Sequence, residues 1–192
     1  MTNKDKFIKI FTENVKREGA AELLAWLEKT DFFVAPASTK FHLCEEGGLC
    51  EHSLNVYECL VERHANEHSP ETLAIVSLLH DLCKAEFYKV SLRNQKNEQT
   101  GQWEKVPYYT IEDRFPFGHG EKSVFLIERF MRLKVEEAIA IRWHMGGFDD
   151  TAKSGGYTIS NAYEMYPLAV KLHIADIEAT YLREGTPTGQ TE

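Results

Sequence analysis

Two kinds of segment are missing from this sequence: a long apolar run and a closely paired cysteine motif. No window of about 18 consecutive apolar residues is present, so we expect no membrane-spanning helix. The opening segment MTNKDKFIKIF is charged and amphipathic, unlike the apolar core of a secretory signal. The four cysteines form no CxxC pair. These absences predict a cytoplasmic protein with reduced thiols. A zinc site from His42, Cys44 and Cys50 is an alternative that the spacing disfavours, because structural zinc prefers close ligand pairs.

Positive charge is also scarce. The chain has 22 lysines and arginines against 30 aspartates and glutamates, a net charge of −8. Proteins that hold duplex nucleic acid present a basic face, so this balance argues against that class of partner. It leaves room for a small anionic ligand at a metal-containing or locally positive site. The length of 192 residues fits one domain.

Helical periodicity covers most of the chain. An apolar stripe at helical spacing predicts helices over 5–17, 20–28, 49–66, 119–131, 134–144 and 161–184. A further helix starts at Ser69-Pro70 and continues through the largely apolar ETLAIVSLLHDLCKAEF, which we expect at the centre of the domain. Residues 146–160 predict a loop, and residues 185–192 a frayed tail.

The segment 88–110 differs from the rest. YKVSLRN and QWEKVPYYT are β-prone and predict an inserted β-hairpin. No internal repeat or interdomain linker is present. The predicted fold class is therefore all-α, a helical bundle with a small hairpin, in a single domain over 1–192. Residues 1–47 form an N-terminal helical extension and residues 48–184 a metal-binding helical core.

One group of polar residues indicates chemistry. His80 and Asp81 stand side by side where the apolar helix turns polar, and both are costly to bury unless they are paired or bind a metal. Other predicted helices each contribute one residue on or beside the apolar side: His52, His119, His144 and Asp176. Helical bundles build metal sites in this way. Imidazole with carboxylate suits Fe, Mn, Ni, Co or Zn rather than calcium.

The remaining histidines fit ordinary structural roles. A single histidine on an apolar face is usually a hydrogen-bonded core residue. This interpretation covers His42, His64, His68 and His173. His173 precedes Asp176 by three residues, so it is also a candidate to orient that carboxylate.

The series His52, His80-Asp81 and Asp176 resembles the HD-domain superfamily of metal-dependent phosphohydrolases over roughly residues 48–182. The resemblance rests on CEHSLNVYECL, IVSLLHDLCKAE and LHIADIEATYL, and on Lys84 three residues after the aspartate. The histidines of HGEKS and RWHMGG are similar to those of the two-metal branch, which includes symmetric dinucleoside polyphosphate hydrolases. The resemblance implies a helical bundle that holds one or two divalent metals.

The resemblance also implies roles for these residues. His52, His80, Asp81 and Asp176 would hold the first metal, and Asp81 would bridge to a second metal held by His119 and His144. Two such metals lower the pKa of a shared water and supply hydroxide near neutral pH. The implied activity is hydrolysis of a phosphoester or phosphoanhydride bond in a small nucleotide, with Asp81 and Lys84 as catalytic residues.

Three cations are candidates for binding substrate phosphate. Lys84 lies about one helical turn after Asp81, although a solvated lysine at a helix end fits the same position. Lys122 and Arg142 lie near His119 and His144 in the sequence, and for both a surface role is the alternative.

The hairpin joins the chain near the proposed ligands, so we expect it beside the mouth of the site. Its aromatic residues can stack on a base and its cations can meet phosphate: Tyr88, Trp103, Tyr108 and Tyr109, with Arg93, Lys96 and Lys105. Simple surface decoration is the alternative.

Three other functions fit the same residues. One is a nucleotide- or metal-binding regulator with little turnover. A second is an exonuclease that acts on single-stranded nucleic acid, against which the acidic balance counts. A third is a metal-dependent oxygenase. The sequence does not determine the oligomeric state.

Overall fold

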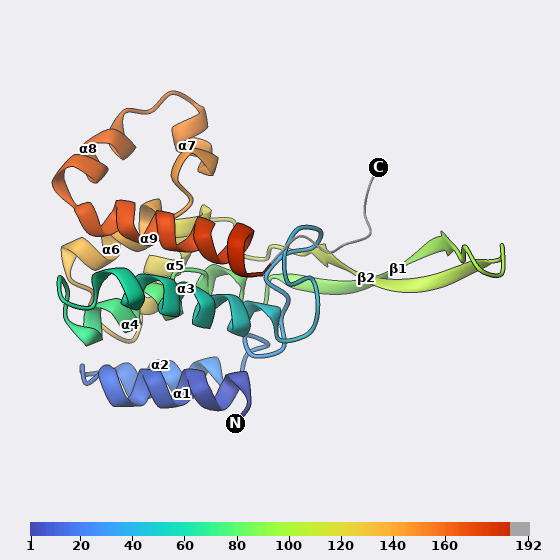
Figure 1. Cartoon of the computed structure of the whole chain (residues 1–192), viewed down its shortest axis with the longest axis horizontal. Helices are drawn as coiled ribbons and strands as arrows, with labels where there is room; N and C mark the ends of the chain where they lie inside the picture. The colour runs from blue at the N-terminus through green and yellow to red at the C-terminus, as the bar shows by residue number, and fades with distance from the viewer. Residues whose placement is uncertain (185–192) are drawn as a thin grey trace.

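The computed structural model describes residues 1–184 as a helical body from which one β-hairpin projects (Figure 1). The predicted all-α class with an inserted hairpin is confirmed. The fraying predicted for 185–192 lies outside the described residues. Within residues 1–184, every helix is too short or too polar to cross a membrane. The main elements are α1 (Asn3–Asn14), α2 (Ala20–Leu27), α3 (Gly48–His64), α4 (Pro70–Leu79), β1 (Tyr88–Lys96), β2 (Trp103–Ile111), α5 (His119–Glu128), α6 (Val135–Trp143), α7 (Asp150–Lys153), α8 (Thr158–Met165) and α9 (Pro167–Glu178).

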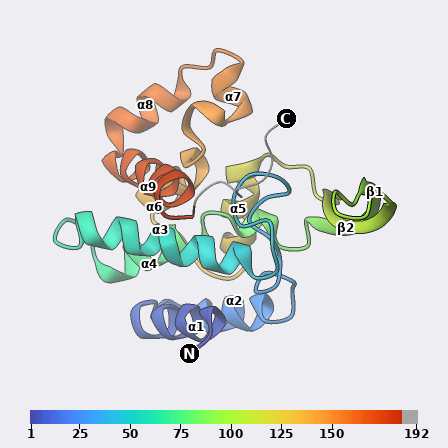
Figure 2. The same cartoon turned by 45° about the vertical axis from the view of Figure 1, so that its right-hand side comes forward.

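The centre of the body is built around α3, α4, α6 and α9. Helix α3 packs against α4 and α9, and α6 packs against α9 and α5. Eight consecutive residues of α4, Thr72–Leu79, are buried, as expected for a helix that is apolar on nearly every side. Helices α1 and α2 lie along the other side of α3 and α4 (Figures 1 and 2), where Phe7 and Phe11 join the same hydrophobic cluster.

Helix α4 begins as predicted and ends earlier than predicted. The Ser69 side chain accepts a hydrogen bond from the backbone of Thr72, and Pro70 occupies the first turn. The helix ends at Leu79 instead of continuing to Phe87. Asp81 leaves the helical conformation with φ −99° and ψ 22°, and a short 3₁₀ turn follows. The chain then turns outward into the hairpin.

The C-terminal part also differs from the prediction. The helix expected over 161–184 is divided into α8 and α9, because Pro167 lacks a backbone N–H and disfavours a helical residue before it. The expected loop 146–160 contains a 3₁₀ turn, helix α7 and the start of α8. Asp149 caps α7 by accepting from the N–H groups of Thr151 and Ala152. The sequence analysis missed this helix because Gly146 and Gly147 come just before Asp149 and favour a loop.

The hairpin confirms the predicted strands. β1 and β2 pair antiparallel from Tyr88 opposite Ile111 to Lys96 opposite Trp103. The hairpin extends away from the helices and is seen nearly end-on in Figure 2. An isolated two-stranded hairpin is only marginally stable, so its anchorage matters. At its base, the Tyr88 hydroxyl donates to the carbonyl of Ala37 at 3.1 Å.

A buried ion pair fastens the N-terminal helices to α6. Arg17 places Nη1 2.6 Å and Nη2 2.7 Å from the two carboxylate oxygens of Glu137, which is fully buried. The Thr72 hydroxyl donates to the same carboxylate at 2.8 Å. Burial alone would raise the pKa of Glu137, but the hydrogen bonds, from Arg17 above all, lower it below the ordinary value.

We expect Arg17→Ala to lower the free energy of unfolding by about 3 kcal/mol, because the buried Glu137 carboxylate loses its bidentate partner and its remaining cation is the Lys134 ammonium at 3.9 Å. Urea denaturation at pH 7 measures this loss. The difference from wild type should shrink as the pH falls through the lowered pKa of Glu137, since a protonated carboxyl no longer needs the cation. Lys9→Ala is the control, because its exposed pair with Glu13 contributes about 0.5 kcal/mol or less. Equal losses in both variants would contradict the role of the pair.

Candidate metal centre

The structure brings all six predicted ligands together inside the helical body. His52 comes from α3, His80 and Asp81 follow the end of α4, and Asp176 comes from α9. His119 is the first residue of α5, and His144 follows α6. Their ligand atoms form overlapping groups, each with atoms within 4.8 Å of one another: His52, His80 and Asp81; His80, His144 and Asp176; and Asp81, His119 and His144.

Asp81 lies between two sets of imidazoles. Its Oδ1 is 2.7 Å from Nε2 of His119 and 3.5 Å from Nε2 of His144. Its Oδ2 is 3.5 Å from Nε2 of His80 and 3.7 Å from Nε2 of His52. Each carboxylate oxygen therefore faces its own pair of histidines. This is the arrangement that a ligand shared by two metals requires.

Two of the histidines are oriented by the helices that precede them. Nδ1 of His80 lies 2.7 Å from the carbonyl oxygen of Ser77, and Nδ1 of His144 lies 2.7 Å from that of Ile141. Because a carbonyl only accepts, Nδ1 carries the proton in both rings and Nε2 is left as a lone-pair donor. Burial lowers the pKa of His80 to about 4, so this ring is neutral at pH 7.

Nε2 of His144 gives the sharpest sign of a missing partner. It is buried and has no hydrogen-bond partner within the described part of the chain. Buried polar atoms are nearly always satisfied, so an orphan of this kind calls for a bound group. The atom points toward Asp81 Oδ1 in a group of nitrogen and oxygen donors. That donor set fits a divalent transition metal.

His52 is held by a carboxylate that the sequence analysis missed. Its Nδ1 lies 2.9 Å from Oε1 of Glu184, and its Nε2 lies 3.2 Å from Oδ1 of Asp176. Burial disfavours the charged ring, but the hydrogen bonds to Asp176 and Glu184 outweigh it and raise the pKa of His52 to about 9. A metal at Nε2 would therefore displace a proton from this ring. Glu184 orients the imidazole as carboxylates do behind many metal-bound histidines.

A π-helical turn accounts for the position of Glu184. The turn spans Ala179–Arg183, and the backbone N–H of Glu184 bonds to the carbonyl of Ala179, five residues back. The wider turn gives Glu184 a direction that a regular helix would not. Such turns are rare and have no sequence signature, so the pattern offered no signal for this residue.

A close contact between α5 and α6 brings His119 and His144 together. Gly120 lies against the backbone of Arg142, and a Cβ at this glycine would come 2.2 Å from the Arg142 carbonyl oxygen. The Ser123 hydroxyl on α5 accepts from the N–H of Cys83 at 3.0 Å, which fixes the turn after Asp81 to the same helix. Glycine in HGEKS is thus required by packing beside the site.

A family model described as HD domain matches residues 49–180, more than half of the chain. The chain belongs to the HD domain family. Searches of curated proteins and of solved structures found no match. The matched range contains all six ligands, and HD domains bind divalent metals. It leaves out Glu184 and His42, which the fold nevertheless brings to the centre.

We call the cluster of the six predicted ligands the HD centre. A cavity of about 480 Å³ opens onto it. Its polar wall includes His52, Asp81, Asp176 and Lys84. The Lys84 ammonium lies 2.7 Å from Asp81 Oδ2, so Lys84 is not a solvated helix-end residue. Burial alone would lower the pKa of Lys84, but the adjacent carboxylate raises it, and the same cation helps to hold the pKa of Asp81 well below its ordinary value.

The lining of the cavity also contains residues that the sequence analysis did not select. Lys153 supplies a second cation and His42 an imidazole. Both ring nitrogens of His42 are buried without a hydrogen-bond partner in residues 1–184, unlike the satisfied core histidine that the sequence predicted. Apolar side chains complete the lining: Phe41, Met145, Phe148, Ile177 and Tyr181.

The structure places two predicted substrate-binding cations elsewhere. The Lys122 side chain is buried, with its ammonium 2.7 Å from Asp113, and it lies over the ring of Phe87. Arg142 pairs with Glu121 and lies 2.9 Å from Asp149. Neither lines the cavity that contains Lys84, so we do not retain them as phosphate ligands.

The structure also decides between interpretations that the sequence left open for His173, for Cys44 and Cys50, and for the hairpin. His173 Nδ1 donates to the carbonyl of His144 at 2.6 Å rather than to Asp176. Within residues 1–184, no group of three possible ligands includes Cys44 or Cys50, so the alternative zinc site is not formed. The cavity lining includes no residue of β1 or β2, because the loop 37–44 contributes Phe41 and His42 to that side.

We expect His144→Ala to reduce the manganese bound per chain from two to one, because it removes a ligand on one side of Asp81 only. Elemental analysis after dialysis against manganese and then metal-free buffer measures the ratio. His64→Ala is the control, since His64 pairs with Glu67 on the outside of the body. The assignment fails if His144→Ala binds as much metal as wild type.

Proposed function

We propose that this HD domain protein is a metal-dependent phosphohydrolase that cleaves a phosphoester or phosphoanhydride bond of a nucleotide. One observation carries the proposal: the Asp81 carboxylate lies between two sets of imidazoles at the floor of an open cavity. A centre with a structural metal is closed by its ligands, whereas a catalytic one stays accessible.

The residues divide into two ligand sets around Asp81. His52, His80 and Asp176 would hold one metal with Asp81, and His119 and His144 would hold a second. Bound metals at such a site supply a nucleophile at neutral pH and take negative charge from a phosphoryl oxygen. The chain's own contribution is to fix the donors. The Ser77 and Ile141 carbonyls and the Glu184 carboxylate set the ring orientations before substrate binds.

Lys84 supplies the positive charge next to the reacting group. Its ammonium is held 2.7 Å from Asp81 on the cavity wall, where a phosphate must approach the centre. An ammonium fixed in a partly buried site stabilises negative charge that develops on a phosphoryl oxygen, since little solvent competes with it. Lys153, on the same cavity, is half exposed and is suited to phosphates further from the centre.

The apolar part of the lining favours a nucleotide over a simple phosphate ester. The Phe41, Phe148 and Tyr181 side chains are 70%, 55% and 66% exposed around the cavity. Exposed aromatic side chains next to cations suit a substrate with a planar base and a phosphate chain. We therefore propose a small nucleotide as the substrate class.

We expect Asp81→Asn to abolish hydrolysis of a panel of nucleoside mono-, di- and triphosphates and dinucleoside polyphosphates, as measured by chromatography of the nucleotide products. The amide removes the charge that both ligand sets share, while it preserves the side-chain shape. Glu13→Gln is the control, because it makes the same change at an exposed carboxylate of α1. Circular dichroism shows whether the fold persists. Activity near that of wild type in Asp81→Asn would exclude the proposed centre.

A wild-type chain that turns over none of the panel, yet binds nucleotide and metal, would favour the regulator hypothesis instead. Oxygen consumption without phosphate release would favour an oxygenase.

We expect Lys84→Gln to lower kcat/KM by about 100-fold with metal content unchanged, a size typical for the loss of one electrostatic donor. Steady-state kinetics on the best substrate of the panel, with elemental analysis of the same sample, tests this. Lys89→Gln is the matched control on a nearby exposed lysine, which pairs with Glu112. An unchanged kcat/KM in Lys84→Gln would limit Lys84 to a structural role.

A further inference from the structure

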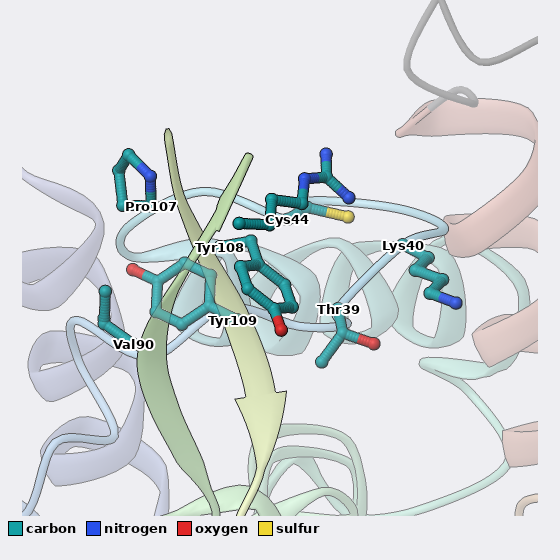
Figure 3. A pocket seen from close by; sticks show the side chains of 8 residues that line it. Thr39, Lys40, Cys44, Val90, Pro107, Tyr108 and Tyr109 are labelled. Carbon is teal, nitrogen blue, oxygen red and sulfur yellow. The ribbon is translucent and has the colours of Figure 1, made fainter. Parts of the chain in front are cut away.

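A second cavity, of about 310 Å³, lies at the base of the hairpin (Figure 3). We call it the hairpin pocket. Thr39 and Lys40 of the loop 37–44 line one side, and Arg93, Tyr108 and Tyr109 of the strands line the other. All five residues lie outside the ligand set of the HD centre. The proposed hydrolysis at the HD centre does not use this pocket, although the sequence analysis considered Arg93, Tyr108 and Tyr109 as residues that contact a nucleotide.

The pocket combines aromatic rings with free positive charge. Tyr108 and Tyr109 are half-buried, and the guanidinium of Arg93 lies 5.4 Å from the centre of the Tyr108 ring. The nearest polar partner of Arg93 is the Gln95 side chain at 3.4 Å. Within residues 1–184, no carboxylate lies within ion-pair distance of Arg93 or Lys40, whereas Lys84 is paired with Asp81.

Two unneutralised cations that line one cavity are unusual in a chain of net charge −8. Like charges that share a cavity repel each other, and an anion between them relieves that repulsion. The neighbouring tyrosine rings offer a surface on which a planar group can stack. The chemistry of the pocket therefore fits a planar aromatic group that carries a phosphate.

The wall that carries Lys40 is already formed. The Ser38 hydroxyl oxygen accepts from the N–H groups of Phe41 and His42 at 2.9 and 3.1 Å. The Ala37 N–H donates to the carbonyl of Leu43 at 3.0 Å, which closes the loop. Lys40 lines the hairpin pocket, while the next residues, Phe41 and His42, line the cavity of the HD centre. One compact loop thus separates the two cavities.

We propose that the hairpin pocket is a second binding site, which takes a nucleoside monophosphate or the equivalent part of a larger nucleotide. Arg93 and Lys40 bind the phosphate, and the Tyr108 ring, which lies beside Arg93, holds the base. The volume, at the lower end of small-molecule pockets, suits one base with its phosphate. The proposal rests on the residues of this pocket and stands whether or not the HD centre hydrolyses nucleotides.

Binding of AMP to the full-length chain tests the proposal, with isothermal titration calorimetry on the protein as purified and again after EDTA treatment. Arg93→Ala and Lys40→Ala should each weaken AMP binding roughly tenfold or more, as expected for loss of a charge-assisted contact. Lys105→Ala is the matched control, because Lys105 lies further along the same hairpin, opposite Asn94. The EDTA-treated protein separates this pocket from the HD centre, because phosphate binding at that centre depends on its metals. Lys105→Ala should bind AMP as wild type does before and after EDTA treatment.

The proposal is overturned if AMP does not bind at millimolar concentration, or if neither Arg93→Ala nor Lys40→Ala weakens it. It is also overturned if Lys105→Ala has an equal effect, which would show general charge attraction, or if EDTA treatment abolishes binding. Because Arg93 and Lys40 are exposed and lie on separate elements, loss of folding in one variant leaves the other as a test.

A kinetic measurement distinguishes the two possible ligands of this pocket, a free nucleoside monophosphate and the far part of a longer nucleotide substrate. AMP that competes with a longer nucleotide in hydrolysis identifies the pocket as the place for the far part of the substrate. AMP that alters kcat without competition identifies a separate regulatory nucleotide. Both effects should disappear in Arg93→Ala, and persistence of either one in that variant would overturn the assignment.

Discussion

Asp81 places a negative charge inside the helical body, where an unpaired carboxylate would be destabilising by several kcal/mol. Lys84 and His119, each with a nitrogen 2.7 Å from a carboxylate oxygen, compensate that charge. The end of α4 at Leu79 and the close contact of α5 with α6 at Gly120 bring donors to this carboxylate, and Glu184, placed by the π-helical turn, orients His52 beside it. The geometry of the centre therefore depends on keeping Asp81 ionised and buried.

The ends of helices position most of the ligands. His80 and His144 each follow the last residue of a helix, and each donates Nδ1–H to the carbonyl three residues back. At a helix end that carbonyl has no intrahelical partner, so the ring satisfies it and in return is fixed in one orientation. The same hydrogen bond to a helix-end carbonyl thus orients one histidine on each side of Asp81. It directs the Nε2 lone pairs of both rings toward the Asp81 carboxylate.

The sequence was informative where the chemistry was local or periodic. The apolar stripes predicted the helices, and the placement of His52, His80, His119, His144 and Asp176 on separate helices predicted their convergence. It was uninformative where a contact depended on geometry between elements. Glu184 reaches His52 only through a π-helical turn, and His42 reaches the cavity only because Ser38 closes its loop. Lys122 is close to His119 in the sequence, but its ammonium pairs with Asp113 outside the cavity.

The central claim is that metals bind on both sides of the Asp81 carboxylate, and anomalous diffraction from crystals grown with manganese tests it most directly. The account predicts two manganese peaks about 3.5–4 Å apart, one beside His52, His80 and Asp176 and the other beside His119 and His144. A single peak away from Asp81, or no peak within reach of these side chains in manganese-saturated crystals, would contradict it.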